Sequence, residues 1–196
     1  MEYSRVLIGE DTRNSRRLWG ETNALVATPT DAITEIGRIL ENPAESGAVV
    51  SGPSGSGRRA SVEAAHSQLI DPQRLIRLNG SSFGQKMPMG VLAFLLAQLE
   101  TTERPSRHEL VHGLARALCP DGKPSVVLLG KPELIDEESG SLLAQLAAMH
   151  KIKLIVICDE IQDLPQDILS LFRTGQMEHV SISRMTTLET RAFLES

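Results

Sequence analysis

Aromatic residues are scarce in this sequence: they make up 3% of its 196 residues, with a single Trp and a single Tyr. The core must therefore be aliphatic, which is typical of a parallel sheet covered by helices on both faces. Only two cysteines occur, Cys119 and Cys158, and their wide separation is unlike a disulfide framework or a metal-binding knuckle. We therefore expect a reducing, cytoplasmic location.

Long hydrophobic runs and an excess of basic residues are also missing. No apolar run approaches the roughly 18 residues of a membrane span, and the N-terminus shows no signal-peptide core, so we expect no membrane association. The net charge of −5 argues against a dominant nucleic-acid-binding surface in this segment. The length suits one α/β domain with short appendages.

Short apolar runs of strand length recur along the chain and alternate mostly with helical patterns. Five runs are present, at 48–51, 75–78, 125–129, 153–157 and 179–182. Helical patterns begin near Thr30, with Thr30 or Asp31 as the N-cap, and follow at 59–70, 88–101, 107–118, 137–150 and 165–173. This alternation predicts βαβ units and a parallel sheet, with the third and fourth runs at its centre because they are apolar after their first residues.

The two ends of the chain differ from this pattern. Residues 1–22 have mixed charge and little periodicity, so we interpret them as a leader before a domain at 23–185. Residues 186–196 have a helical pattern that stops after barely two turns without a stop signal. We therefore expect a fragment of a longer protein.

The first apolar run leads directly into the glycine-rich loop Gly52-Pro-Ser-Gly-Ser-Gly-Arg-Arg59, which a helical pattern follows. A strand, a glycine-rich turn and a helix N-terminus form the context of a phosphate-binding loop, where backbone N–H groups and the helix dipole favour an anion. A plain structural turn is the alternative. The residues predicted to bind phosphate or nucleotide are Gly52, Ser54, Gly55, Ser56, Gly57, Arg58 and Arg59.

The two chemically active positions of the G-x-x-x-x-G-K-[ST] pattern are changed. Arg58 stands at the lysine position and keeps its charge, but a planar fork replaces a compact ammonium. Arg59 stands at the Ser/Thr position and removes the hydroxyl ligand of Mg²⁺. We expect Arg58 to face the anion, and Arg59 to point to solvent or to pair with Asp159 or Glu160, a pairing that would neutralise the site.

The acids that should hold Mg²⁺ at the end of the third run are absent, because this run closes on Gly130 and Lys131. Asp136 and Glu137, farther on, are interpreted as the N-cap and first turn of the next helix. The acids after the fourth run, at 159–160, are interpreted as a solvated loop and not as an acid–base pair. We therefore predict no catalytic residues and no metal site.

A family likeness is carried by the segments 24–33, 87–96, 133–143, 167–182 and 186–196. They resemble the AAA+/STAND ATPase domain at the N-terminus of large LuxR-type transcriptional regulators of actinobacteria, and the last of them resembles the first helix of the family's lid subdomain. The resemblance implies a three-layer α/β P-loop NTPase fold. Its five-stranded parallel sheet would have the order 5-1-4-3-2 of the predicted strands, and a helical lid would begin at the C-terminus.

The resemblance and the lost motifs together predict a hydrolysis-defective regulatory domain that senses a nucleotide or anion and oligomerises. ATP or ADP without Mg²⁺ is the expected ligand. The expected partners are the chain itself and further domains of the same chain, with DNA bound only through a C-terminal helix-turn-helix domain that these residues lack. Two alternatives stay open: a slow Mg-dependent ATPase that uses Arg58 and Asp159, and a protein-interaction module whose loop binds nothing.

Overall fold

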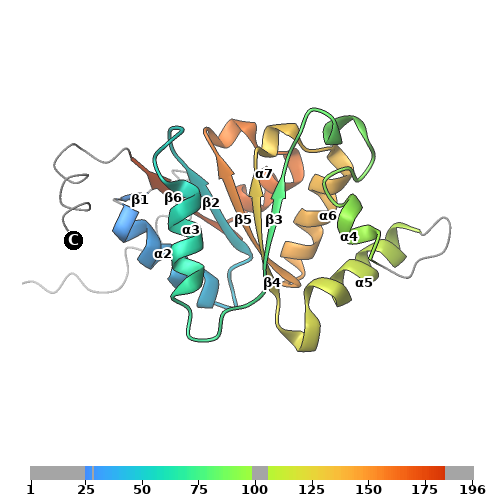
Figure 1. Cartoon of the computed structure of the whole chain (residues 1–196), viewed down its shortest axis with the longest axis horizontal. Coiled ribbons are helices and arrows are strands. Elements are labelled where there is room, and N and C mark those ends of the chain that lie inside the picture. The colour runs from blue at the N-terminus through green and yellow to red at the C-terminus, as the bar shows by residue number, and fades with distance from the viewer. Residues whose placement is uncertain (1–24, 28, 99–105, 184–196) are drawn as a thin grey trace, which may run out of the picture.

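The computed structural model describes residues 25–27, 29–98 and 106–183. These residues form a six-stranded sheet in which all paired strands are parallel, in the order β1-β6-β2-β5-β4-β3 (Figure 1). The strands are β1 (Leu25–Ala27), β2 (Gly47–Ser51), β3 (Leu75–Asn79), β4 (Ser125–Gly130), β5 (Ile152–Cys158) and β6 (Met177–Ile182). The predicted leader and lid helix lie outside the described residues.

The predicted strand order is confirmed, because the strands β6-β2-β5-β4-β3 are the five predicted runs in the order 5-1-4-3-2. Every residue of β4 is buried, and β5 is buried except at Ile157, as expected for central strands. Strand β1 was not predicted. It pairs with β6. With three residues, it is too short to show a periodic pattern.

Helices cover both faces of the sheet and give three layers. They are α2 (Pro29–Glu41), α3 (Arg58–Ser67), α4 (Ala93–Leu96), α5 (Arg107–Leu118), α6 (Glu137–Ala148) and α7 (Gln166–Arg173). One apolar cluster packs α2 and α3 against one face of the sheet. A larger cluster packs α4, α5, α6 and α7 against the opposite face. No helix of the described residues is long and apolar enough to cross a membrane.

Two details of the predicted helices are wrong. Helix α2 begins at Pro29, so Thr30 and Asp31 lie in its first turn and neither is the N-cap; proline fits this position because the first turn needs no N–H donor there. The predicted helix at 88–101 is reduced to α4 within the described residues, because Met89 adopts a left-handed φ of 57° that a helix excludes.

Strand β5 contains a buried charge near its start. Lys153 is 4% exposed, and its Nζ donates hydrogen bonds to the backbone carbonyls of Asn42 and Glu45. Burial lowers the pKa of Lys153, and the nearby Glu45 carboxylate partly offsets this effect. The lysine therefore ties the loop before β2 to the central sheet.

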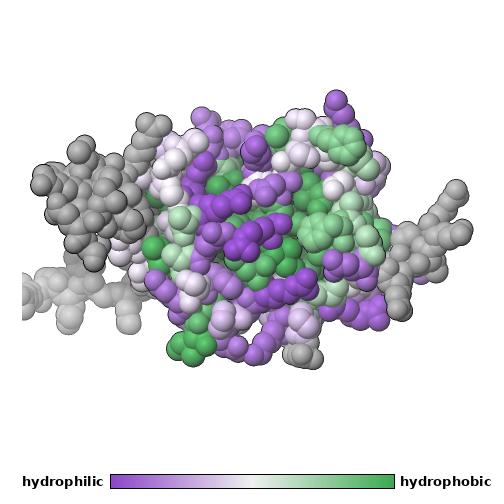
Figure 2. Space-filling model, in the orientation of Figure 1, coloured by the Kyte–Doolittle hydropathy of each residue, from purple (hydrophilic) through white to green (hydrophobic). Residues whose placement is uncertain are grey.

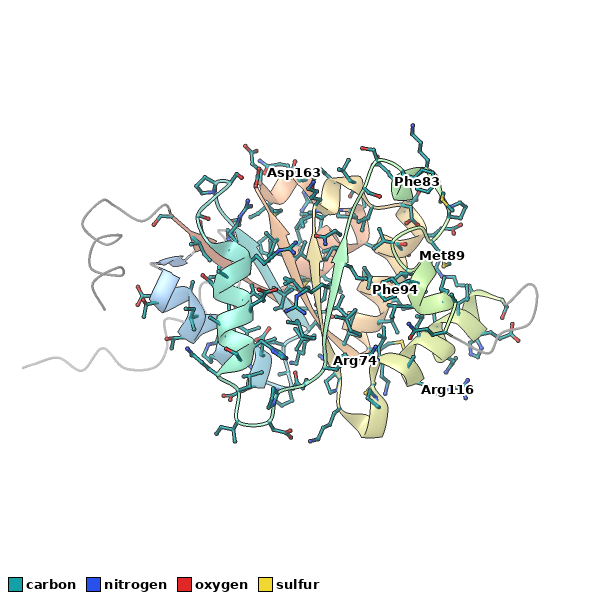
Figure 3. All side chains as sticks on the ribbon, viewed as in Figure 1. Arg74, Phe83, Met89, Phe94, Arg116 and Asp163 are labelled. Carbon is teal, nitrogen blue, oxygen red and sulfur yellow. The ribbon has the colours of Figure 1, made fainter. Side chains whose placement is uncertain are left out.

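The segment between β3 and α5 exposes apolar side chains. Phe83 is 77% exposed and Phe94 is 49% exposed, and both lie on the α4 side of the molecule in Figure 3. Figure 2 shows that hydrophilic side chains gather instead across the middle of this face, near α3. This hydrophilic patch lies beside α3, the helix that follows the glycine-rich loop.

Candidate functional site

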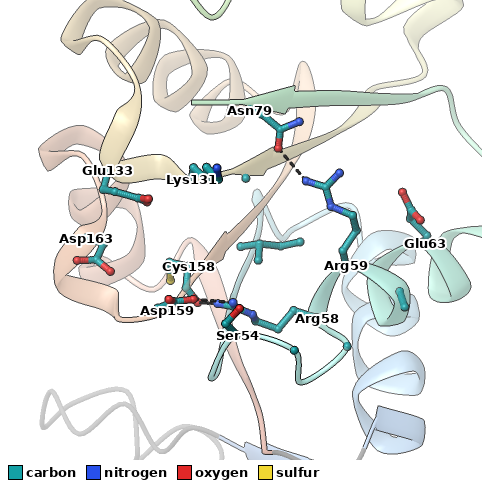
Figure 4. Close-up of a pocket in the computed structure, with 15 residues that line it drawn as sticks. Ser54, Arg58, Arg59, Glu63, Asn79, Lys131, Glu133, Cys158, Asp159 and Asp163 are labelled. Carbon is teal, nitrogen blue, oxygen red and sulfur yellow. Dashed lines mark hydrogen bonds and ion pairs between the residues drawn. The ribbon is translucent and has the colours of Figure 1, made fainter. Parts of the chain in front are cut away.

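A cleft of about 760 Å³ opens at the carboxyl ends of the strands, beside the N-terminus of α3. It is bounded by the loop after β2 and by the residues that end β3, β4 and β5 (Figure 4). Ligands of open α/β sheets bind in this place, because loops and helix N-termini converge there. The cleft is the candidate site.

The glycine-rich loop has a backbone conformation that requires glycine at several positions. Gly55 and Gly57 have left-handed φ values of 82° and 84°, and Gly57 precedes α3 as a cap residue without a side chain. A Cβ at Gly52 would lie 2.2 Å from the carbonyl oxygen of Ile182, so this glycine allows β2 and β6 to approach closely. The first turn of α3 receives no side-chain cap, which leaves it suited to an anion.

Five of the seven predicted binding residues line the cleft, and two do not. Ser54, Gly55, Gly57, Arg58 and Arg59 belong to its wall. Gly52 and Ser56 are not among the lining residues, and Ser56 is only 5% exposed. Their place is in the packing that holds the loop.

Arg59 reaches across the cleft toward the ends of β3 and β4. Its Nη2 donates a 2.7 Å hydrogen bond to Oδ1 of Asn79, and a Cβ built on Gly130 would lie 3.1 Å from the same nitrogen. In the P-loop pattern this position carries a hydroxyl that binds Mg²⁺ opposite the acids that end the equivalent strand. The guanidinium thus lies between the position that carries this hydroxyl and the strand end that carries these acids in the pattern.

Arg58 extends in another direction and contacts the end of β5. Its Nη2 lies 2.5 Å from Oδ1 of Asp159, and its Nη1 donates to the carbonyl oxygen of Cys158. The predicted pairing of Arg59 with Asp159 or Glu160 is therefore wrong, because Arg58 pairs with Asp159 and Arg59 binds Asn79. That Arg58 faces an anion stays a prediction. Consecutive residues of a helix point about 100° apart, so the two arginines diverge (Figure 4).

The structure confirms the interpretation of Asp136 as an N-cap. Its carboxylate accepts 2.9 Å hydrogen bonds from the backbone N–H groups of Ser139 and Met89, and a longer one from Val91. Burial would raise the pKa of Asp136, but these hydrogen bonds outweigh it and hold the pKa below its ordinary value. Glu137 lies in the first turn of α6, as predicted.

The thiol in the cleft wall is inert. Cys158 is 2% exposed, and burial raises its pKa to about 12, although the nearby Arg58 acts in the opposite direction. Such a thiol stays protonated at neutral pH and is no nucleophile. Within 25–27, 29–98 and 106–183, no three His, Cys, Asp or Glu residues are grouped so that they could hold a metal ion.

Sequence reasoning missed several polar residues of the cleft, because they come from separate elements. Asn79 could have been found as a polar residue at the carboxyl end of a strand. Glu133 and Asp163 belong to short 3-10 turns after β4 and β5 and carry no local signal.

The cleft has three cationic and four carboxylate side chains, which are Arg58, Arg59, Lys131, Glu63, Glu133, Asp159 and Asp163. Two of the carboxylates are paired with arginines, Asp159 with Arg58 and Glu63 with Arg77.

Solved structures share this fold. Cdc6p from Pyrobaculum aerophilum is similar over 92% of this chain, with a TM-score of 0.63 and 14% sequence identity, and the match covers 52% of that protein's chain. Drosophila ORC bound to DNA is similar over 84% of this chain, with a TM-score of 0.55 and 16% identity, and the match covers 45% of its chain. This chain therefore spans about half the length of the chains it matches.

At such low identities the likeness shows the fold alone. No protein-family model matches the sequence, and no curated protein does. Together with the strand order, this likeness shows that the chain has the α/β fold of an AAA+ P-loop NTPase-like domain.

Proposed function

We propose that this chain is a hydrolysis-defective P-loop domain that binds a nucleotide or another polyphosphate without a metal ion. The observation that carries the proposal is the position of Arg59. Its guanidinium is held by Asn79 beside Gly130, the strand end that carries the Mg²⁺-binding acids in a working site of this type. An arginine can neutralise phosphate charge directly, and its planar fork suits phosphate oxygens.

Three other features of the cleft favour an anion, although its four carboxylates oppose one. The first turn of α3 has no side-chain cap, and the loop before it contains glycines with positive φ. Lys131 adds a third cation from the end of β4, and it also has a left-handed φ, of 53°. The cleft volume of about 760 Å³ lies in the range of small-molecule sites.

The same residues argue against hydrolysis. Phosphoryl transfer depends almost entirely on positioning and on electrostatic stabilisation of the transferred group, in which the metal ion has a central part. Arg59 replaces the hydroxyl ligand, and Gly130 and Lys131 replace the acids. Asp159, which a slow ATPase would need, is engaged by Arg58.

We further propose that the domain regulates transcription as part of a longer chain. The support is the sequence resemblance to the ATPase domain of LuxR-type regulators, together with the fold. In this proposal the partners are other copies of the chain and further domains of the same chain. DNA would be bound by a separate helix-turn-helix domain.

Calorimetric titration with ATP, in EDTA and then in excess Mg²⁺, tests the nucleotide part, with phosphate release measured in parallel. The expected result is binding in EDTA, weaker binding in Mg²⁺ and no release above a blank reaction. Arg59→Ala should weaken binding, whereas Arg38→Ala, which removes an exposed arginine of α2, serves as the matched control. Mg-dependent binding with turnover would establish the slow ATPase instead, and no binding under either condition would leave an interaction module.

A further inference from the structure

We infer that His108 and His112 form a binding site for a divalent transition-metal ion, such as Zn²⁺ or Ni²⁺, on the surface of α5. This inference goes beyond the proposed function, because no residue of α5 lines the cleft. It also departs from the sequence-based prediction of no metal site. The sequence only spaces the two histidines one helical turn apart, whereas the structure brings their imidazole rings together.

The packing of α5 leaves both histidines exposed. The helix buries Val111, Leu114 and Leu118 in the larger apolar cluster. His108 and His112 lie outside this apolar stripe and are exposed. Residues four apart are neighbours on one side of a helix, so both side chains reach the same patch of surface.

The two rings are close enough to share one ligand. Their centroids are 4.2 Å apart, and their planes are tilted by 55°. Among the residues that the structure describes, no group forms a hydrogen bond with either ring. No described group therefore competes with a metal ion for the ring nitrogens.

The start of α5 is fixed by a capping box. Ser106 Oγ accepts a hydrogen bond from the N–H of Glu109, and the Glu109 carboxylate accepts one from the N–H of Ser106. This box holds the turn that carries His108, one turn before His112. Ligands that are already held in place lose less conformational freedom when an ion binds, so the helix supports the site.

The chemistry of the pair selects the class of ion. Imidazole suits Zn²⁺, Ni²⁺ and Cu²⁺, whereas Mg²⁺ and Ca²⁺ prefer oxygen ligands. Two histidines four residues apart on one helix face also supply two of the ligands in a known type of zinc site. No third His, Cys, Asp or Glu joins the pair within the described part of the chain, so water must complete the coordination. Binding is therefore weaker and more exchangeable than at a four-ligand structural zinc site.

Calorimetric titration of the metal-stripped full chain with Ni²⁺, Zn²⁺ and Mg²⁺ tests the inference. The variants are His108→Gln and His112→Gln, with His150→Asn as the control. His150 is exposed in the loop between α6 and β5, and asparagine tolerates its left-handed φ of 51°. Melting temperatures without metal show that each protein is folded.

The expected result is one Ni²⁺ or Zn²⁺ ion per wild-type chain and no binding of Mg²⁺. Each glutamine variant should bind at least about tenfold more weakly, because the second imidazole no longer adds an intramolecular contact. His150→Asn should bind as the wild type does. If the two histidines bound metal independently, each glutamine variant would lose one of two ions and keep its affinity, and this would overturn the inference. No binding to the wild-type chain, or an equal loss in His150→Asn, would overturn it as well.

Discussion

Replacing Asp136 should lower the unfolding free energy and release the segment that follows β3, because this one carboxylate binds two parts of the fold. It caps α6 through the N–H of Ser139, and it also accepts the N–H groups of Met89 and Val91. The Asp136→Ala variant removes all three acceptors at once. The segment between β3 and α5 then loses its tie to the helix that follows β4.

The cost can be estimated from these contacts. Loss of an N-cap carboxylate destabilises a protein by about 1 kcal/mol. A hydrogen bond to a charged acceptor contributes about 1.5 to 3 kcal/mol, and the long contact to Val91 contributes little. We therefore expect a loss of roughly 3 kcal/mol of unfolding free energy in Asp136→Ala, which lowers the melting temperature of a chain of this length by about 6 to 12 °C.

Urea unfolding followed by far-ultraviolet circular dichroism measures this loss. Glu137→Ala is the control, because Glu137 is exposed in the first turn of the same helix and its removal should cost below about 1 kcal/mol. A loss below about 1 kcal/mol in Asp136→Ala, or an equal loss in both variants, would refute the reasoning. Dependence of the loss on Mg²⁺ would restore a metal role for Asp136.

The pH dependence has a definite sign. Because the folded-state pKa of Asp136 is lowered, its stabilisation is present above the unfolded value, about 3.9, and is lost as the pH falls through the folded value. The wild-type chain should therefore lose this contribution below about pH 4. Asp136→Asn keeps the cap but cannot ionise, so its unfolding free energy should fall less over the same range.

Three further measurements test other parts of the structure. Gly130→Ala places a Cβ 2.6 Å from Oδ1 of Asn79, so it should cost about 1 kcal/mol, and the Asn79→Ala background should remove most of this cost in a double-mutant cycle. Lys153→Met removes the ammonium that donates to the backbone carbonyls of Asn42 and Glu45 and should cost about 2 kcal/mol in urea unfolding. Burial lowers the folded-state pKa of His179, so unfolding free energy should decrease as the pH falls through about 6.5, and His179→Gln should flatten that slope.

The sheet could be predicted from the sequence because its strands carry a strong local signal. The run at 125–129 is apolar at each position except its first, and burial on both faces follows directly from that pattern. The strand order came from the resemblance to a known family and not from the runs themselves. Strand β1 was beyond prediction, since three residues give no periodicity. The predicted helix at 88–101 was wrong at its start, because Met89 has a left-handed backbone and its N–H is bound by Asp136. Local sequence does not contain this tertiary contact.

The site was predictable only as far as it lies in one stretch of sequence. The loop itself was found from its glycines, and five of its residues line the cleft. The directions of Arg58 and Arg59 depend on how α3 is rotated about its axis relative to the ends of β3 and β5. No local sequence pattern contains this rotation. Asn79 lies twenty residues beyond Arg59 and shows its importance only through the hydrogen bond between them.

Arg59, Asn79 and Gly130 fit one another, and this favours the proposed anion site over a loop that binds nothing. A side chain at position 130 would push against the Asn79 oxygen that holds Arg59, so the guanidinium can lie there only because Gly130 has no Cβ. An acid at that position, as the working pattern requires, would also attract Arg59 and neutralise it. Arg59, Asn79 and Gly130 therefore form a mutually dependent set, and the set leaves a cation facing the cleft. This arrangement supports the proposed metal-free anion site, because a loop that bound nothing would need no cation held toward the cleft.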